Sequence, residues 1–201
     1  MARPIVKREF ITRGVVEVIA RKGLHATTIQ DIANAAQVSP GLLYRYWEDR
    51  DDLAAEVYVE HYERVLQYVA GRVALQTDFV GKLRAMVEAV LQFADEQTHI
   101  LRFLLFSQHE LATHVTPERN IHHWLEQLLD EGMRAGVVRP VDRQVAVQIL
   151  IGIVLQPIVG GLYGRSPTPF LALRDELLRA IEGALLVSPR VTGKTVGKPR
   201  K

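Results

Sequence analysis

The sequence predicts an all-α protein of about nine helices, and three observations support this prediction. Apolar residues recur at helical spacing through most of the chain, whereas the alternation typical of strands is almost absent. Hydrophobic residues make up 48% of the 201 residues, which is enough to bury a sizeable core. The 14 Gly and 9 Pro are too few for a disordered or fibrous chain. We expect a small three-helix domain in residues 1–50, a larger helical domain in residues 51–189 and a basic tail, without a fixed fold, in residues 190–201.

The first two helices are predicted from their apolar faces and their ends. Residues 7–22 place Ile11, Val15 and Ile19 on one face, and Gly23 follows at the position of a helix-ending left-handed residue. A short second helix follows Thr28, whose hydroxyl can accept a hydrogen bond from a free backbone N–H.

The third helix is predicted at residues 40–47. Ser39 and Pro40 form its start signal, because proline suits the first helical position and a preceding serine can cap it. Leu43 and Trp47, one turn apart, are its expected inward pair. The remaining side chains of this short helix face outward.

The remaining six helices follow from the same signals. The acidic stretch at residues 48–52 opens a long fourth helix through Val69, and Asp78 caps the fifth. Residues 100–111 are apolar nearly all round, which predicts a centrally buried sixth helix. The seventh is expected to start at Thr116–Pro117, and the last two span 142–163 and 169–187.

Residues 145–163 are the one stretch that resembles a membrane span. Gln148, Gln156, Pro157 and two glycines interrupt it, and its longest apolar run is far below the roughly 20 residues that a span requires. We therefore expect no membrane segment. The first ten residues also lack the apolar stretch of a signal peptide, so a cytoplasmic protein is expected.

Composition excludes several kinds of chemistry. The chain has no cysteine, so disulfides, thiol catalysis and cysteine-based zinc sites are excluded. Its histidines do not form the paired pattern of zinc proteases, so no metal site and no cofactor are expected. No nucleophile with a base and no phosphate-binding loop is recognisable, which argues against an all-α enzyme.

Charge is unevenly distributed along the chain. Residues 1–50 carry a net charge of +3, residues 51–189 carry −6 and residues 190–201 carry +5. A basic head on an acidic body suits a protein that offers one end to phosphate, although ordinary surface variation gives the same pattern. Whether the basic tail contacts nucleic acid stays open.

Two short helices joined by a turn of about four residues form the geometry of a helix-turn-helix, whose second helix enters the major groove of DNA. The stretch TTIQDIANAAQVSPGLLYRYWEDRDDL resembles the N-terminal domain of the tetracycline-repressor (TetR) family in composition, order and spacing together. The resemblance covers about residues 8–56. It implies double-stranded operator DNA as a partner and a transcriptional regulator as the function.

The resemblance also implies residue roles. Thr28 would contact a phosphate, Gln30 would reach a base edge, and Arg45 would bind guanine or phosphate. Thr28 and Ser39 are alternatively only helix caps. The predicted DNA-binding residues are Thr28, Gln30, Ser39, Pro40, Gly41, Leu42, Tyr44, Arg45, Tyr46 and Arg50.

Two positions depart from the family pattern. Gln37 occupies the place of the usual turn glycine, and a positive φ there would cost about 1 kcal/mol that glycine avoids. Arg50 stands where lysine is common, which keeps a cationic charge.

In the family, the later helices form a ligand pocket and the last two helices form a homodimer. The eighth and ninth helices, at residues 142–163 and 169–187, are apolar enough to form an intersubunit bundle. An unknown small apolar or aromatic effector is the implied ligand. Aromatic residues and histidines on the helices around the cavity are its candidate lining, although such aromatics also suit an ordinary core. They are Tyr58, His61, Tyr62, Phe93, His99, Phe103, Phe106, His109 and Trp124.

We therefore expect a ligand-responsive repressor, with activation as an open alternative. A helical scaffold protein without DNA binding is a second alternative, but it leaves the outward tyrosines and the basic head unexplained.

Overall fold

A computed structural model describes residues 5–187, with side chains from Arg8 onward. Within that range the chain forms nine α-helices, which confirms the all-α prediction. The predicted tail at residues 190–201 lies outside the described residues. The helices are α1 (Ile5–Lys22), α2 (Ile29–Ala35), α3 (Pro40–Leu43), α4 (Arg50–Val73), α5 (Phe79–Glu96), α6 (Thr98–Leu111), α7 (Ile121–Arg134), α8 (Arg143–Leu162) and α9 (Arg174–Leu185).

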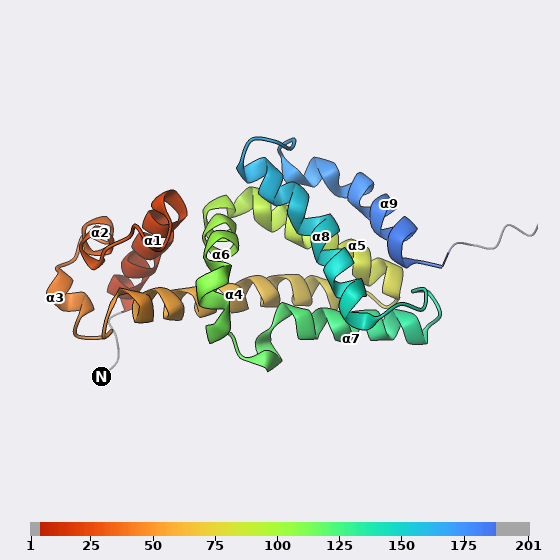
Figure 1. The fold of residues 1–201 in the computed structure, drawn as a ribbon, viewed down its shortest axis with the longest axis horizontal. Helices are drawn as coiled ribbons and strands as arrows, with labels where there is room; N and C mark the ends of the chain where they lie inside the picture. The colour runs from red at the N-terminus through yellow and green to blue at the C-terminus, as the bar shows by residue number, and fades with distance from the viewer. Residues whose placement is uncertain (1–4, 188–201) are drawn as a thin grey trace, which may run out of the picture.

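The molecule is elongated, and the long helix α4 runs along it (Figure 1). Helices α1–α3 form one end, α5 and α7–α9 form the body, and α6 stands across the boundary between them. No linker separates the two parts at residue 50, because α4 begins there and continues without interruption to Val73.

The N-terminal end has its own apolar core. Leu43 of α3 is fully buried, and Trp47 beside it donates from Nε1 to Glu56 Oε2 of α4 at 2.9 Å. Helices α1 and α2 cross closely, since a Cβ built on Gly14 would lie 3.0 Å from the backbone nitrogen of Ala36. This core continues into α6 through Phe103, so α6 packs against the N-terminal helices.

The second core lies in the body. It joins the end of α4 to α5, α7, α8 and α9, with Leu91, Leu150 and Ile181 fully buried in it. Both cores contain residues of α4 and α6. A displacement of either helix would therefore change the packing of both cores.

Helix α6 corrects one expectation. Its nearly all-round apolar composition predicts central burial, but Gln108 and His109 are exposed, because α6 lies at the boundary between the two parts and not inside the body.

Helix α3 is shorter than predicted. It ends at Leu43, and residues 44–46 form turns. The backbone N–H of Trp47 still donates to the carbonyl of Leu43 at 3.1 Å. This hydrogen bond helps to keep Trp47 in the N-terminal core, as expected.

Two helix starts differ from the prediction. The pair Thr116–Pro117 begins a single 3-10 turn, Pro117–Arg119, and α7 begins at Ile121 after the side chain of Asn120 caps it. Pro169 likewise precedes a 3-10 turn, Phe170–Leu173, so α9 begins at Arg174. Proline favours any first turn, and a 3-10 turn satisfies it as well as an α-helix does.

Helix α8 is long and apolar enough to cross a membrane, yet only 28% of its most apolar window is buried within the chain. It continues through Pro157 to Leu162. Val145 and Gly152 are among its exposed residues. Exposed apolar residues on a helix whose other face lies in the body core form a candidate contact surface.

Gln37 has a φ of 56°, the left-handed conformation that its position in the turn requires. Replacing Gln37 by glycine is therefore expected to raise the free energy of unfolding by about 0.5–1 kcal/mol, a rise of roughly 2–3 °C in melting temperature. Thermal melting monitored by circular dichroism checks this. Gln67→Gly, on the exposed face of α4, is the matched control and should lower stability, because φ is negative there. An unchanged or lower melting temperature for Gln37→Gly contradicts the expectation.

Candidate nucleic-acid interface

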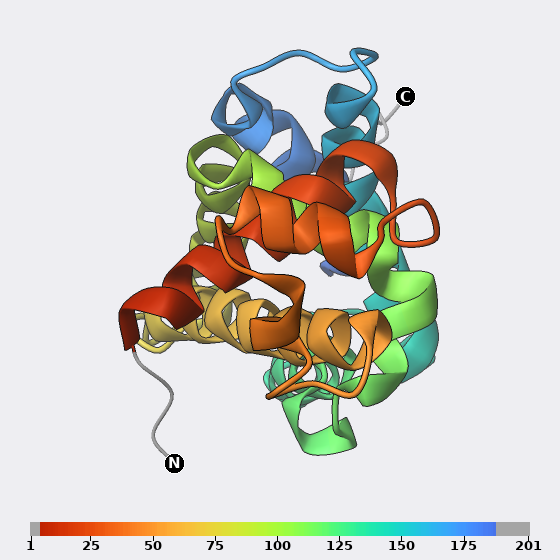
Figure 2. The ribbon, with the colours of Figure 1, turned by 90° about the vertical axis from the view of Figure 1, so that its left-hand side faces the viewer.

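Helices α2 and α3 lie at the outer end of the molecule, away from the body (Figures 1 and 2). Leu43 anchors the α3 segment in the N-terminal core, and the two residues that follow it, Tyr44 and Arg45, face solvent. The side chain of Tyr44 is 56% exposed, and Arg45 is exposed beside it. Neither side chain makes a hydrogen bond or ion pair within residues 5–187. An exposed phenol and guanidinium at the tip of a basic domain are well suited to phosphate and base edges.

The start of α3 is open to a partner. Ser39 is the N-cap residue, but its hydroxyl makes no capping hydrogen bond. Pro40 is the first helical residue, and Leu42 is half-buried. A Cβ built on Gly41 would meet nothing within 4 Å, so nothing in the fold requires glycine there. This surface allows the backbone to approach another molecule closely.

Thr28 acts as a helix cap. Its hydroxyl accepts from the backbone N–H of Asp31 at 3.2 Å, and its own N–H donates to Asp31 Oδ2 at 2.8 Å. The ammonium of Lys22, together with Thr28, holds the pKa of Asp31 well below its usual range. Gln30 is exposed next to Thr28 and donates from Nε2 to Asn34 at 2.9 Å. The hydrogen-bonding groups of Thr28 are thus already paired with Asp31. Gln30 would have to give up only its hydrogen bond to Asn34 to contact DNA.

Arg50 is also occupied within the chain. Its Nη1 donates to the carbonyls of Leu24 at 3.0 Å and Thr27 at 2.8 Å, and its Nε donates to Asp51 at 2.8 Å. These bonds tie the start of α4 to the turn between α1 and α2. Tyr46 is half-buried with its ring edge-on to Trp47. A phosphate contact from Arg50 would have to compete with the carbonyl bonds.

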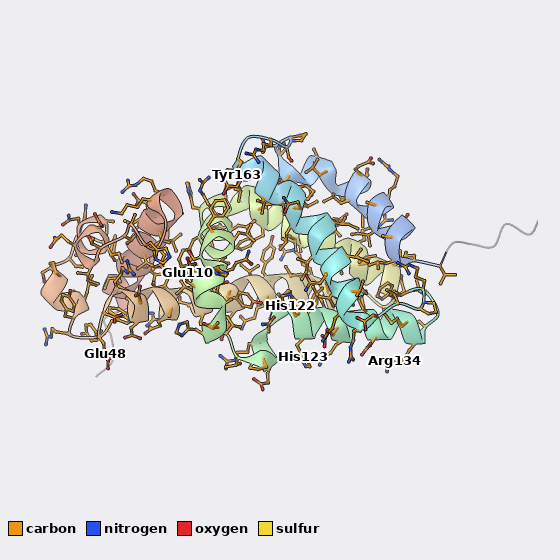
Figure 3. All side chains as sticks on the ribbon, viewed as in Figure 1. Glu48, Glu110, His122, His123, Arg134 and Tyr163 are labelled. Atoms are coloured by element: carbon orange, nitrogen blue, oxygen red, sulfur yellow. The ribbon has the colours of Figure 1, made fainter. Side chains whose placement is uncertain are left out.

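The connection between the two ends was not foreseen from the sequence. Arg102 of α6 donates from Nε to the carbonyl of Ala20 in α1 at 3.0 Å and from Nη1 to the carbonyl of Leu162 in α8 at 3.2 Å. The ring of Phe106, one turn along α6, packs on Tyr163 at 5.3 Å between centroids. Tyr163 lies near the boundary, and Glu110 lies on the side of α6 that faces α1 (Figure 3). The charge of Arg102, whose neighbours Leu101 and Phe103 are apolar, was the available signal.

The candidate pocket residues do not line one cavity. Tyr58 and Phe103 are fully buried against each other, with Tyr62 stacked on Tyr58. Phe93 packs on Tyr68 in the body, and Trp124 is half-buried on α7. Phe106 and His109 lie on the surface of α6. His61 and His99 line the cleft described in the next paragraph.

A cleft of about 810 Å³ lies between α1, α4 and the start of α6. Arg8, Thr12 and Val16 are among the residues that α1 supplies, whereas His61 comes from α4 and Ile100 from α6. The cleft therefore lies between the helix-turn-helix and the body.

His61 is 6% exposed, and its Nε2 is buried without a hydrogen-bond partner. Burial lowers its pKa below the usual 6.5, the nearby Arg64 lowers it further, and Glu60 opposes them. The unfolded chain therefore binds a proton on His61 more readily than the folded chain. Stability on this account is unaffected above pH 6.5 and falls as the pH drops below that value.

We expect the melting temperature of the protein to fall more steeply between pH 7.5 and pH 5.5 than that of His61→Phe, which carries no proton at this position. Differential scanning calorimetry at the two pH values measures this. Parallel curves for the two proteins contradict the expectation.

Among residues 5–187, no group of three His, Cys, Asp or Glu side chains could hold a metal ion.

Residues 11–57 match the model of the family described as bacterial regulatory proteins, tetR family. The HTH-type transcriptional regulator YhgD of Bacillus subtilis (strain 168) is 20% identical to this chain over 73% of this chain and 80% of its own. Among solved structures, the fatty acid degradation regulator FadR from Bacillus halodurans is 22% identical, with a TM-score of 0.77, covering 89% of this chain and 99% of that one. FadR from Bacillus subtilis in complex with stearoyl-CoA is 17% identical, with a TM-score of 0.71, covering 87% and 97%. The solved structures share the fold along nearly the whole chain.

Proposed function

We propose that this chain, which belongs to the tetR family of bacterial regulatory proteins, is a homodimeric repressor that a small apolar effector releases from operator DNA. Membership makes it a DNA-binding transcriptional regulator and not an enzyme. The observation that carries the proposal is the exposed α3 segment at the outer end of the molecule, with Tyr44 and Arg45 directed outward from a buried Leu43. A cytoplasmic location follows from access to DNA.

The proposed DNA surface combines the start of α3 with the residues just after it. Ser39, Gly41, Tyr44 and Arg45 have side chains or backbone open to a groove, and Gln30 lies beside them on α2. Thr28 and Arg50 serve chiefly to hold this surface in shape, because their polar atoms are bonded to Asp31 and to the α1–α2 turn.

A homodimer through α8 and α9 is the second part of the proposal. Val145 and Gly152 are exposed on α8, and the neighbouring Ile149 and Ile153 are half-buried. Gly183 is exposed on α9 with open space around its Cα. Two copies joined by these helices would form a four-helix interface, with two recognition helices to reach half-sites about 34 Å apart.

The effector is proposed from chemistry and from relatives. The body is built around apolar helices, and FadR from Bacillus subtilis, which shares the fold, has been solved in complex with stearoyl-CoA. An acyl-CoA is therefore the first effector to test. It can shift the regulator only by binding the DNA-free arrangement more tightly than the DNA-bound one.

Transcription in vitro from the promoter upstream of the protein's own gene tests this function. Added protein should reduce the transcript, and stearoyl-CoA should restore it whereas free CoA should not. An increase in transcript on adding the protein would indicate an activator, and restoration by neither compound would reject an acyl-CoA effector.

A further inference from the structure

We propose that the cleft between α1, α4 and α6 binds an uncharged, largely apolar small molecule that carries a hydroxyl group. This site lies outside the body core of α5 and α7–α9. It would contact the helix-turn-helix and the body at once.

The size and floor of the cleft support a small-molecule site. Its volume of about 810 Å³ lies within the range of roughly 300–1,000 Å³ that ligand pockets occupy. Val16 and Ile100 give it apolar walls from opposite sides of the domain boundary.

Two polar groups at the cleft have no partner of their own. The Nε2 atom of His61 is buried without a hydrogen bond, in a side chain that is 94% buried, as its 6% exposure implies. Thr12 is 9% exposed, and its hydroxyl makes no hydrogen bond within the described part of the chain. The buried Nε2 of His61 without a partner is costly to the fold, so a ligand that bonds to it gains affinity, and the Thr12 hydroxyl offers a second hydrogen-bonding group.

The protonation of His61 selects the ligand's polar group. The ring lies edge-on to Phe103, and its lowered pKa keeps it neutral at neutral pH. A neutral imidazole has one donor and one acceptor nitrogen, and a hydroxyl can serve as the partner of either. A hydroxyl also matches the Thr12 side chain.

The charges around the cleft favour an uncharged ligand. Arg8 contacts Glu56 and Glu60 at 2.8 Å each, and Arg64 contacts Glu60 at 2.7 Å. The three arginines of the lining, Arg8, Arg13 and Arg64, are matched in number by Glu9, Glu17 and Glu60. A charged ligand would have to compete with the ion pairs of Arg8 and Arg64, whereas a neutral one leaves them intact.

The test uses 2-naphthol as the probe and the full-length protein without DNA, by isothermal titration calorimetry at pH 7.5. We expect saturable binding of one probe per protomer, and naphthalene, which lacks the hydroxyl, should bind about tenfold more weakly. His61→Phe and Thr12→Val should each weaken 2-naphthol binding by about tenfold. His123→Phe, an exposed histidine on α7 outside the cleft, is the matched control and should bind like the parent protein.

Absence of saturable binding, or equal affinity of the parent and both cleft variants, would overturn the proposal. If His61→Phe fails to fold, Thr12→Val decides the matter, because Val is nearly isosteric with Thr. Since no DNA is present, a failure of repression or of acyl-CoA release leaves this result unaffected.

Discussion

Replacing both Tyr44 and Arg45 by alanine is expected to weaken operator binding by about a thousandfold or more and to leave the fold unchanged. The two side chains are exposed at the end of α3 and make no hydrogen bond or ion pair within residues 5–187, so their loss costs the folded chain little. A surface substitution of this kind usually changes stability by less than about 0.5 kcal/mol.

The size of the effect follows from symmetry. A lost contact to a phosphate or base edge costs about 1 kcal/mol or more, and a homodimer loses each contact twice. Two residues in two protomers therefore cost about 4 kcal/mol, which corresponds to about a thousandfold in affinity. Fluorescence anisotropy with labelled operator DNA measures it.

Arg134→Ala is the control for this prediction. Arg134 is exposed on α7 at the opposite end of the molecule from α3 (Figure 3). Its loss should leave affinity unchanged. Near-normal operator affinity in the double variant, with a normal melting temperature, would show that α3 does not make the DNA contacts assigned to it.

Replacing Gly152 by glutamate is expected to convert the proposed dimer to a monomer and to abolish operator binding at protein concentrations that saturate the parent. Gly152 is exposed on α8, and a Cβ built there meets nothing within 4 Å, so the single chain accepts the side chain. Glutamate also favours a helix more than glycine does, by about 0.5–1 kcal/mol. In the proposed dimer, however, two carboxylates would be buried together without partners, which costs several kcal/mol.

Gly71→Glu provides a matched control, because Gly71 is also an exposed helical glycine with nothing within 4 Å, but it lies on α4. Light scattering after gel filtration should give about 22.7 kDa for Gly152→Glu and twice that mass for the control. A dimeric Gly152→Glu protein, or a monomeric one that still binds the operator at full affinity, rules out the proposed interface.

The fold was largely predictable, because helical periodicity and cap residues are local signals. Asp78 and Thr28 cap α5 and α2 as expected, and Leu43 is buried as expected. The errors at Pro117 and Pro169 share one cause, since a proline start signal does not distinguish one 3-10 turn from a full helix.

Side-chain partners were less predictable than helices. The sequence cannot show whether Tyr58 and Phe103 meet each other or face a cavity, since both outcomes need the same inward position. Likewise, the charge of Arg50 suits a phosphate and the carbonyl of Thr27 equally well. Arg102 escaped notice because its partners, Ala20 and Leu162, are distant in sequence and contribute only backbone oxygens.

The most direct test of the account is the affinity of the parent protein for the DNA flanking its own gene, compared with a scrambled duplex of the same composition. We expect two protomers per site, an affinity at least about a thousandfold higher than for the scrambled duplex, and a loss of several orders of magnitude between about 50 and 200 mM salt. Equal affinity for both duplexes, or binding that salt does not weaken, would contradict a sequence-specific regulator whose α3 segment reads DNA.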